Sequence, residues 1–145
     1  MYLKTSKRLP SIFIPFEAHE GQVDKSGLPY ILHPIHLAEQ MQDETTTIAA
    51  LLHDVVEDTE YTLEDLRKMG FSDTVVEAVT LLTYVEGTPY MEYVADIKEN
   101  SVARAVKLAD LQHNSDMTRL DTITERDRKR VAKYREAMKL LEAEV

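Results

Sequence analysis

The chain has 145 residues, of which 43% are hydrophobic and 30% are charged. This length and composition predict one globular domain, residues 1–145, with a single core. Cysteine is absent, which excludes a disulfide framework and a thiolate zinc site, and the net charge of −9 argues against non-specific binding to a nucleic-acid backbone.

Only four glycines and five prolines occur, which favours helices over a strand-and-turn architecture. Gly27 and Pro29 indicate a loop over residues 21–30, and Pro34 suits the first position of the helix that follows. No strand is required. We predict helices at residues 10–20, 34–41, 45–56, 62–70, 73–82, 89–97, 102–114 and 124–143.

Several of these helices begin at residues that can cap them. Asp43 or Thr45 can accept a hydrogen bond from the first turn of the third helix. Thr62 and Asp65 resemble a capping box in which Asp replaces Glu, and Ser72 precedes the next helix. These side chains therefore fix three helix starts.

The helix predicted at residues 45–56 is apolar around most of its circumference, so we expect it to be deeply buried. Its last turn contains His53 and Asp54. A buried carboxylate needs a cation, a hydrogen-bond donor or water, because leaving it unpaired costs several kcal/mol. Taken alone, the two residues fit a buried pair satisfied by the backbone as well as they fit a pair of metal ligands.

Two further ligand-type residues strengthen the metal interpretation. His33 lies upstream and Asp110 downstream, and with His53 and Asp54 they make a plausible site of two histidines and two aspartates. Nitrogen and oxygen donors together suit Mn²⁺, Fe²⁺, Zn²⁺ or Co²⁺. Such an ion can lower the pKa of water and polarise a phosphoryl group.

Glu57 and Asp58 follow the two central ligand candidates. Each comes four residues after one of them, so in a continuous helix both would project one turn further along the same face. That placement lets a carboxylate act as an acid or base beside a metal without being its ligand. We therefore expect Glu57 and Asp58 to be catalytic.

The last predicted helix combines an apolar stripe with many basic residues. Val131, Tyr134, Met138 and Leu141 form the stripe. We interpret the basic residues as a solvated face of alternating charge. They are Arg126, Arg128, Lys129, Arg130, Lys133 and Arg135.

Several segments together are similar to a known family. They are Ala18–Gln22, Lys25–Gly27, Pro29–Pro34, Ala50–Thr59 and Val106–Asp110 with His113 and Asn114. In this order and spacing they resemble the HD-domain hydrolase of the RelA/SpoT stringent-response proteins. The resemblance covers roughly residues 10–140, with no synthetase or regulatory part, and so indicates a small stand-alone form.

The resemblance implies an all-α fold, a single HD-domain helical bundle. It also implies a Mn²⁺-dependent guanosine-3′,5′-bis(diphosphate) 3′-pyrophosphohydrolase. The residues that match the family's metal ligands are His33, His53, Asp54 and Asp110, and those that match its catalytic pair are Glu57 and Asp58. The residues that match its substrate contacts are Lys25, Ser26, Asn114, Arg130 and Tyr134.

One position departs from the family pattern. The family loop commonly has an arginine that stacks on guanine, and Asp24 stands there instead. A carboxylate cannot stack as a cation and would repel phosphates. The alternatives are therefore an HD phosphohydrolase for another nucleotide or phosphate ester, and a non-catalytic nucleotide-binding sensor module.

The sequence also bears on partners and location. The longest strongly apolar run without a charged residue or histidine is Ile48–Leu52, far too short to cross a membrane. The N-terminal residues lack a signal-peptide pattern. We therefore expect a cytoplasmic protein that binds a small nucleotide but neither nucleic acid nor a membrane, while its oligomeric state stays open.

Several other residues keep two interpretations. We expect His19 to pack a helix end against the loop, His36 to lie outside the site, and Lys107 to be a surface cation. His113 fits a hydrogen bond near the metal as well as plain core packing. Three tyrosines could line a base pocket, but core or rim packing is the more ordinary interpretation. They are Tyr84, Tyr90 and Tyr93.

Overall fold

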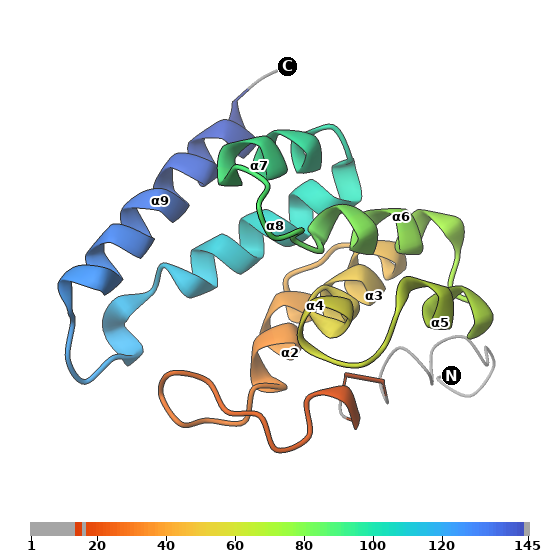
Figure 1. Cartoon of the computed structure of the whole chain (residues 1–145), viewed down its shortest axis with the longest axis horizontal. Coiled ribbons are helices and arrows are strands. Elements are labelled where there is room, and N and C mark those ends of the chain that lie inside the picture. The colour runs from red at the N-terminus through yellow and green to blue at the C-terminus, as the bar shows by residue number, and fades with distance from the viewer. Residues whose placement is uncertain (1–13, 16, 144–145) are drawn as a thin grey trace.

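The computed structural model describes residues 14–15 and 17–143. In this part of the chain it has α-helices, one 3-10 helix and no strand beyond an isolated bridge between Val23 and Pro29, which confirms the all-α fold class (Figure 1). The α-helices are α2 (Leu32–Glu39), α3 (Glu44–Leu52), α4 (Val55–Asp58), α5 (Leu63–Lys68), α6 (Asp73–Leu82), α7 (Tyr90–Lys98), α8 (Ser101–Asn114) and α9 (Glu125–Glu142). The 3-10 helix is Met117–Arg119.

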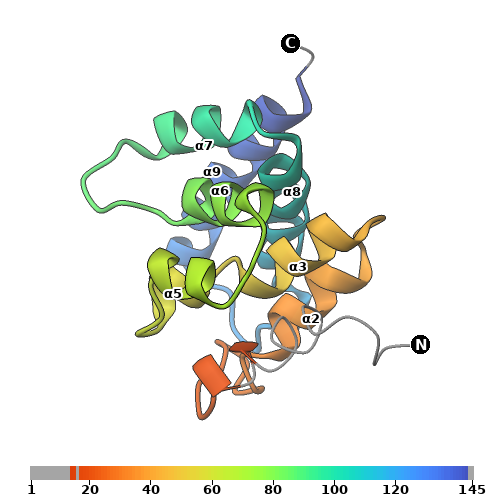
Figure 2. The same cartoon turned by 90° about the vertical axis from the view of Figure 1, so that its right-hand side faces the viewer.

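Helix α3 lies at the centre of the bundle. It packs against α2, α6 and α8, while α9 packs against both α7 and α8 (Figures 1 and 2). Two apolar clusters meet at α3 and α6: a larger one shared with α2, α7, α8 and α9, and a smaller one shared with α4 and α5. The predicted burial of the central helix is confirmed, since Ala49, Ala50 and Leu52 are fully buried.

The predicted caps are confirmed. Asp43, rather than Thr45, accepts a hydrogen bond from the backbone N–H of Thr46 at 2.8 Å. Thr62 and Asp65 form the capping box of α5. The side chain of Ser72 caps α6, and the predicted bounds of that helix are the observed ones. These boundaries follow from hydrogen bonds within one turn, which the sequence alone specifies.

Two helices predicted near the N-terminus have bounds that differ from the observed ones or lie partly outside the described residues. Residues 10–13 and 16 of the helix predicted at residues 10–20 lie outside the described residues. Residues 14–15 and 17–18 are helical, and residues 19–20 form a turn. The second helix starts at Leu32 rather than at Pro34, so the prediction for its first position is wrong by two residues. Proline is still compatible with this position, because a backbone N–H in the first helical turn has no partner within the helix.

The prediction of one continuous helix at residues 45–56 is wrong. The helix stops at Leu52, turns at His53 and Asp54, and resumes as α4. In a continuous helix the carbonyl of Ala50 would accept the N–H of Asp54. Here that carbonyl accepts a hydrogen bond from Nδ1 of His53, at 2.7 Å. The imidazole thus takes the acceptor that the helix would have used.

Helix α9 has 18 residues and a narrow apolar side. Val131, Ala137 and Leu141 are buried, and Tyr134 and Met138 are partly buried beside them, as the predicted stripe requires. None of the described helices is both long enough and apolar enough to span a bilayer.

The packing of α2 yields a test of the core. Leu37 is fully buried, whereas Leu32 on the same helix is 48% exposed. Leu37→Ala should lower the free energy of unfolding by about 2–5 kcal/mol, because it removes buried methyl groups and leaves a cavity. Leu32→Ala should change it by less than about 0.5 kcal/mol. Urea unfolding of both variants checks this, and equal losses would contradict the packing described for α2.

Candidate metal centre and active site

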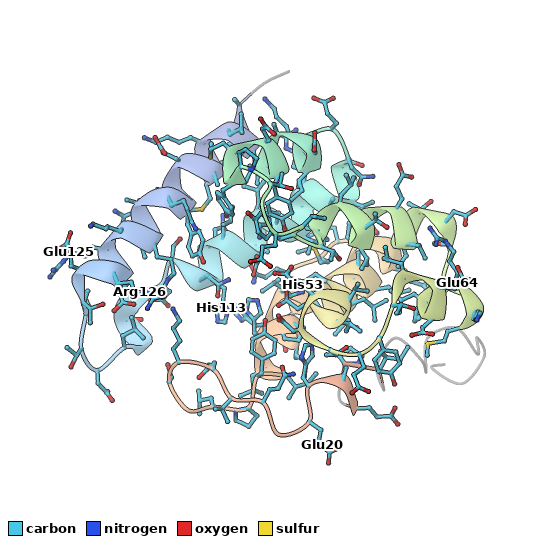
Figure 3. The ribbon with its side chains drawn as sticks, viewed as in Figure 1. Glu20, His53, Glu64, His113, Glu125 and Arg126 are labelled. Carbon is cyan, nitrogen blue, oxygen red and sulfur yellow. The ribbon has the colours of Figure 1, made fainter. Side chains whose placement is uncertain are left out.

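Four side chains from three parts of the fold meet near the middle of the molecule, where Figure 3 shows His53. Nε2 of His33 lies 2.9 Å from Oδ1 of Asp110 and 4.0 Å from Oδ2 of Asp54. Nε2 of His53 lies 2.9 Å from Oδ2 of Asp54 and 3.6 Å from Oδ1 of Asp110. Donor atoms that bind one ion at about 2.1 Å lie roughly 3–4 Å from one another. Ligand atoms of His33, His53 and Asp54 all lie within 4.8 Å of one another, so these three could hold an ion. Oδ1 of Asp110 lies beside both imidazoles and could complete the set.

The orientation of His53 fits a metal ligand. Its Nδ1 faces the carbonyl of Ala50, which can only accept, so the proton is on Nδ1. Its Nε2 is buried and, although it lies 2.9 Å from Oδ2 of Asp54, it makes no hydrogen bond of adequate geometry within the described residues. Burial alone would lower the pKa of His53, but the carboxylates of Asp54 and Asp110 raise it well above its usual value. The centre therefore favours a positive charge at this point, which a divalent ion supplies.

His33 is held by a second imidazole. Its Nδ1 lies 2.6 Å from Nδ1 of His113, and the two rings stack with centroids 4.8 Å apart. With the proton on Nδ1 of His33, the Nε2 that faces Asp110 keeps its lone pair for an ion. Of the two interpretations of His113, the hydrogen bond beside the candidate metal ligands is the one that the contact with His33 supports. His36 is exposed and touches the ring of His113 at a centroid distance of 4.5 Å.

Both aspartates of the centre are largely buried, yet their surroundings lower the pKa of each below its usual value. Burial opposes ionisation of Asp110, but Lys107, with Nζ 3.0 Å from Oδ2, and the two histidines hold its pKa well below the usual range. Burial also opposes ionisation of Asp54, and His53 and a hydrogen bond donated by the Tyr30 hydroxyl lower its pKa. The prediction that Lys107 is a surface cation is wrong, because its side chain is only 13% exposed.

Glu57 and Asp58 line the same cavity as His53 and Asp54, although the helix break changes the path that brings them there. This cavity has a volume of about 360 Å³. Oε2 of Glu57 accepts a hydrogen bond from the backbone N–H of Tyr84 at 3.2 Å. Partial burial raises the pKa of both acids, and the negative charge of Asp54 raises it further. Such carboxyls can give and take protons closer to neutral pH than ordinary acids.

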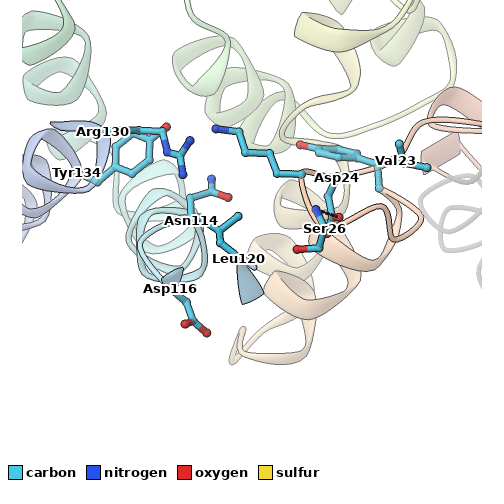
Figure 4. Close-up of a pocket in the computed structure, with 10 residues that line it drawn as sticks. Val23, Asp24, Ser26, Asn114, Asp116, Leu120, Arg130 and Tyr134 are labelled. Carbon is cyan, nitrogen blue, oxygen red and sulfur yellow. Dashed lines mark hydrogen bonds between the residues drawn. The ribbon is translucent and has the colours of Figure 1, made fainter. Parts of the chain in front are cut away.

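A second cavity, of about 270 Å³, adjoins the first. Figure 4 shows it between the loop that carries Asp24 and Ser26, the C-terminal end of α8 at Asn114, and the part of α9 that carries Arg130 and Tyr134. Tyr30, Asn114 and Tyr134 line both cavities. The five predicted substrate contacts all line the smaller one: Lys25, Ser26, Asn114, Arg130 and Tyr134.

Asp24 shapes the loop in which it lies. Its Oδ1 accepts a hydrogen bond from the backbone N–H of Ser26 at 2.8 Å (Figure 4). The same oxygen accepts a hydrogen bond from the backbone N–H of Leu28 at 3.0 Å. Gly27 has φ +80°, a conformation that favours glycine. Where the family has a stacking arginine, this chain thus has a carboxylate that binds its own loop backbone.

Other residues at the site were not predicted from the sequence. Tyr30 binds Asp54 and comes one helical turn before His33, which is the only local signal for it. Lys133 lies in the basic run of the last helix, which we interpreted as a solvated face, yet it lines the larger cavity.

The residues with two interpretations are now placed. His19 packs as predicted: its ring contacts Tyr30, and its Nδ1 is hydrogen-bonded to Gln22. The three tyrosines left open in the sequence, at positions 84, 90 and 93, line the larger cavity.

This chain is similar to a family of known proteins. The model of the HD domain matches residues 15–143. The chain is 35% identical over 147 residues to the bifunctional (p)ppGpp synthase/hydrolase SpoT of Escherichia coli, covering 88% of this chain and 20% of that protein. It is 43% identical over 109 residues to a GTP pyrophosphokinase of Streptomyces coelicolor, covering 66% and 13%.

Among solved structures, a metazoan orthologue of SpoT that hydrolyses ppGpp superposes with a TM-score of 0.76 and 26% identity. That match covers 96% of this chain and 87% of the other. The chain spans a fifth or less of the two bacterial proteins. Because the family model covers nearly every described residue, the chain belongs to the HD domain family.

Proposed function

We propose that this protein is a metal-dependent phosphohydrolase that removes the 3′-pyrophosphate from guanosine-3′,5′-bis(diphosphate). The observation that carries the proposal is the position of the four-ligand centre, directly beside a cavity lined by all five predicted nucleotide contacts. The likeness to SpoT and to a ppGpp-hydrolysing orthologue supports the choice of substrate.

His33, His53, Asp54 and Asp110 would hold the ion. Two imidazole nitrogens with two carboxylates suit a divalent transition metal, and we propose Mn²⁺ because its preference for oxygen donors fits the carboxylates. When bound, the ion supplies positive charge that polarises the phosphoryl group and makes water a better nucleophile.

The protein's own residues position the substrate and move protons. The smaller cavity holds the nucleoside, with Lys25 and Arg130 near its phosphates, and Tyr30 borders both cavities where the scissile phosphorus must lie. A water oxygen bonds to that phosphorus, the bond from phosphorus to the ribose 3′-oxygen breaks, and pyrophosphate is released. Glu57 and Asp58 take the proton from water and return one to the 3′-oxygen.

Product analysis tests this function. Purified protein with Mn²⁺ and ppGpp should release GDP and pyrophosphate in equal amounts, as measured by ion-exchange chromatography and ³¹P NMR. A parallel panel with GTP, deoxynucleoside triphosphates and NADPH tests the alternative substrates. Turnover of one of these without turnover of ppGpp would contradict the proposed substrate, and no turnover of any would favour a nucleotide-binding module.

The metal assignment makes a direct prediction. His53→Ala and Asp110→Ala should each lose most of the bound ion, because each removes one of four donors. His36→Ala should keep the metal content of the wild type, since His36 is exposed and contacts none of the four donors through a hydrogen bond. Elemental analysis of the purified proteins measures this. Unchanged metal content in the first two variants would refute the assignment.

The acidic pair makes a kinetic prediction. Glu57→Gln and Asp58→Asn should keep the bound ion but lower kcat by roughly 10²-fold or more, the range expected when general acid–base catalysis is lost. Glu64→Gln is the matched control, because Glu64 is exposed, lines neither cavity and, among the described residues, pairs with Arg67 alone. Wild-type turnover in both site variants would assign the proton transfers to other groups.

Asp24 makes a prediction about affinity. Asp24→Asn keeps an oxygen that can accept the two loop N–H groups and removes a negative charge beside an anionic substrate. The KM for ppGpp should fall by roughly 2- to 5-fold, a gain of about 0.5–1 kcal/mol. Asp24→Ala loses the loop hydrogen bonds and should raise KM, and Asp24→Arg loses them while adding a stacking cation. A lower KM for Asp24→Ala than for Asp24→Asn would contradict this role.

A further inference from the structure

The larger cavity has an aromatic side. Four rings form a continuous series in which neighbouring centroids are 5.3, 5.9 and 6.5 Å apart. In order along the series they are Tyr84, Tyr93, Tyr90 and Tyr134, here called the tyrosine wall. All four line the larger cavity, which is also lined by the acidic pair and by three of the four proposed metal ligands: His53, Asp54 and Asp110. Aromatic faces attract cations, so this wall can hold ammonium groups at the cavity surface.

Two lysines lie on the tyrosine wall. Nζ of Lys107 is 5.2 Å from the ring centre of Tyr93, and its charge is already paired with Asp110. Nζ of Lys133 is 4.5 Å from the ring centre of Tyr90 and 5.6 Å from that of Tyr134. A contact with a ring positions an ammonium group without neutralising it.

Lys133 differs from Lys107 because no carboxylate of the described residues lies within 4.0 Å of it. Lys25, in the smaller cavity, likewise has no such ion pair, whereas Arg130 pairs with Asp127 at 3.2 Å. Each cavity thus offers one lysine whose charge is not paired with a carboxylate.

The metal centre lies at the border of the two cavities. Tyr30 and Asn114, which line both, are hydrogen-bonded to Asp54 and Asp110 respectively. A substrate at this border can therefore extend toward Lys25 on one side and toward Lys133 on the other. In a chain with a net charge of −9, these lysines mark where anionic groups are tolerated.

We propose that Lys133 is a specificity-determining residue that binds the outer phosphate of the pyrophosphate group being removed. Lys133 would thereby favour a diphosphate over a monophosphate at the position that is hydrolysed. This inference rests on the proposed function for its orientation, because the nucleoside must occupy the smaller cavity. A lysine suits this role, since a phosphate oxygen can accept a charge-assisted hydrogen bond from its ammonium.

Titration calorimetry with inorganic pyrophosphate and with orthophosphate tests the subsite without turnover. The proteins are the Mn²⁺-loaded wild type, Lys133→Gln, Lys133→Arg and Lys139→Gln, with bound Mn²⁺ measured before and after. Lys139 is a matched control because it is exposed on the same helix and lines neither cavity.

Lys133→Gln should weaken pyrophosphate binding by about tenfold and orthophosphate binding by less than about twofold, as loss of one charged hydrogen bond predicts. Lys133→Arg should restore most of the affinity, and Lys139→Gln should match the wild type. Unchanged pyrophosphate affinity in Lys133→Gln, or an equal loss for both anions, would overturn the proposal.

Steady-state kinetics with ppGpp separates this inference from the function on which it rests. Lys133→Gln should raise KM by about tenfold and change kcat by less than about threefold, because the contact serves ground and transition states alike. If the wild type does not hydrolyse ppGpp but pyrophosphate binding still depends on Lys133, the proposed substrate is wrong and the subsite stands. If ppGpp is hydrolysed and neither KM nor pyrophosphate binding changes, the subsite is wrong and the function stands.

Discussion

Two ionised aspartates buried against two imidazoles are the constraint on which the rest of the site depends. Asp54 and Asp110 have little contact with solvent, and a carboxylate in that position costs several kcal/mol unless positive charge or hydrogen-bond donors surround it. The fold supplies donors from Tyr30, Asn114 and Lys107. Carboxylate oxygens of both aspartates lie beside the imidazole Nε2 atoms. A divalent ion bound there would neutralise their remaining negative charge.

The backbone is interrupted after α3, at His53 and Asp54, where two of the candidate ligands lie. The turn at His53 interrupts a segment that is otherwise apolar and helical, and the lost helical hydrogen bond is replaced by one from the imidazole to Ala50. The same interruption lets α4 begin afresh and carry Glu57 and Asp58 to the cavity. His113 on α8 holds His33 of α2 in the way that the Ala50 carbonyl holds His53: its ring nitrogen contacts Nδ1 of His33, so that Nε2 faces the centre.

What could be predicted from the sequence is what local chemistry determines. The caps at Asp43, Thr62 and Ser72 depend on residues three positions away. The four ligand candidates could be proposed from residue type and order, and the fold places them near one another. The break at His53 could not be foreseen, because a continuous helical pattern does not reveal that a side chain will compete for a backbone carbonyl. Lys133 contacts Tyr90, which lies more than forty residues away in the sequence. The charge pattern of the last helix therefore indicated only a solvated face at this position.

The central claim is that one ion is bound by His33, His53, Asp54 and Asp110. Anomalous X-ray scattering at the manganese absorption edge, from crystals grown with Mn²⁺, tests it most directly. The account predicts one strong anomalous peak bounded by the two imidazole Nε2 atoms and by a carboxylate oxygen from each aspartate, with Glu57 and Asp58 outside direct coordination. A peak held by Glu57 and Asp58, or no peak between the two histidines, would contradict it.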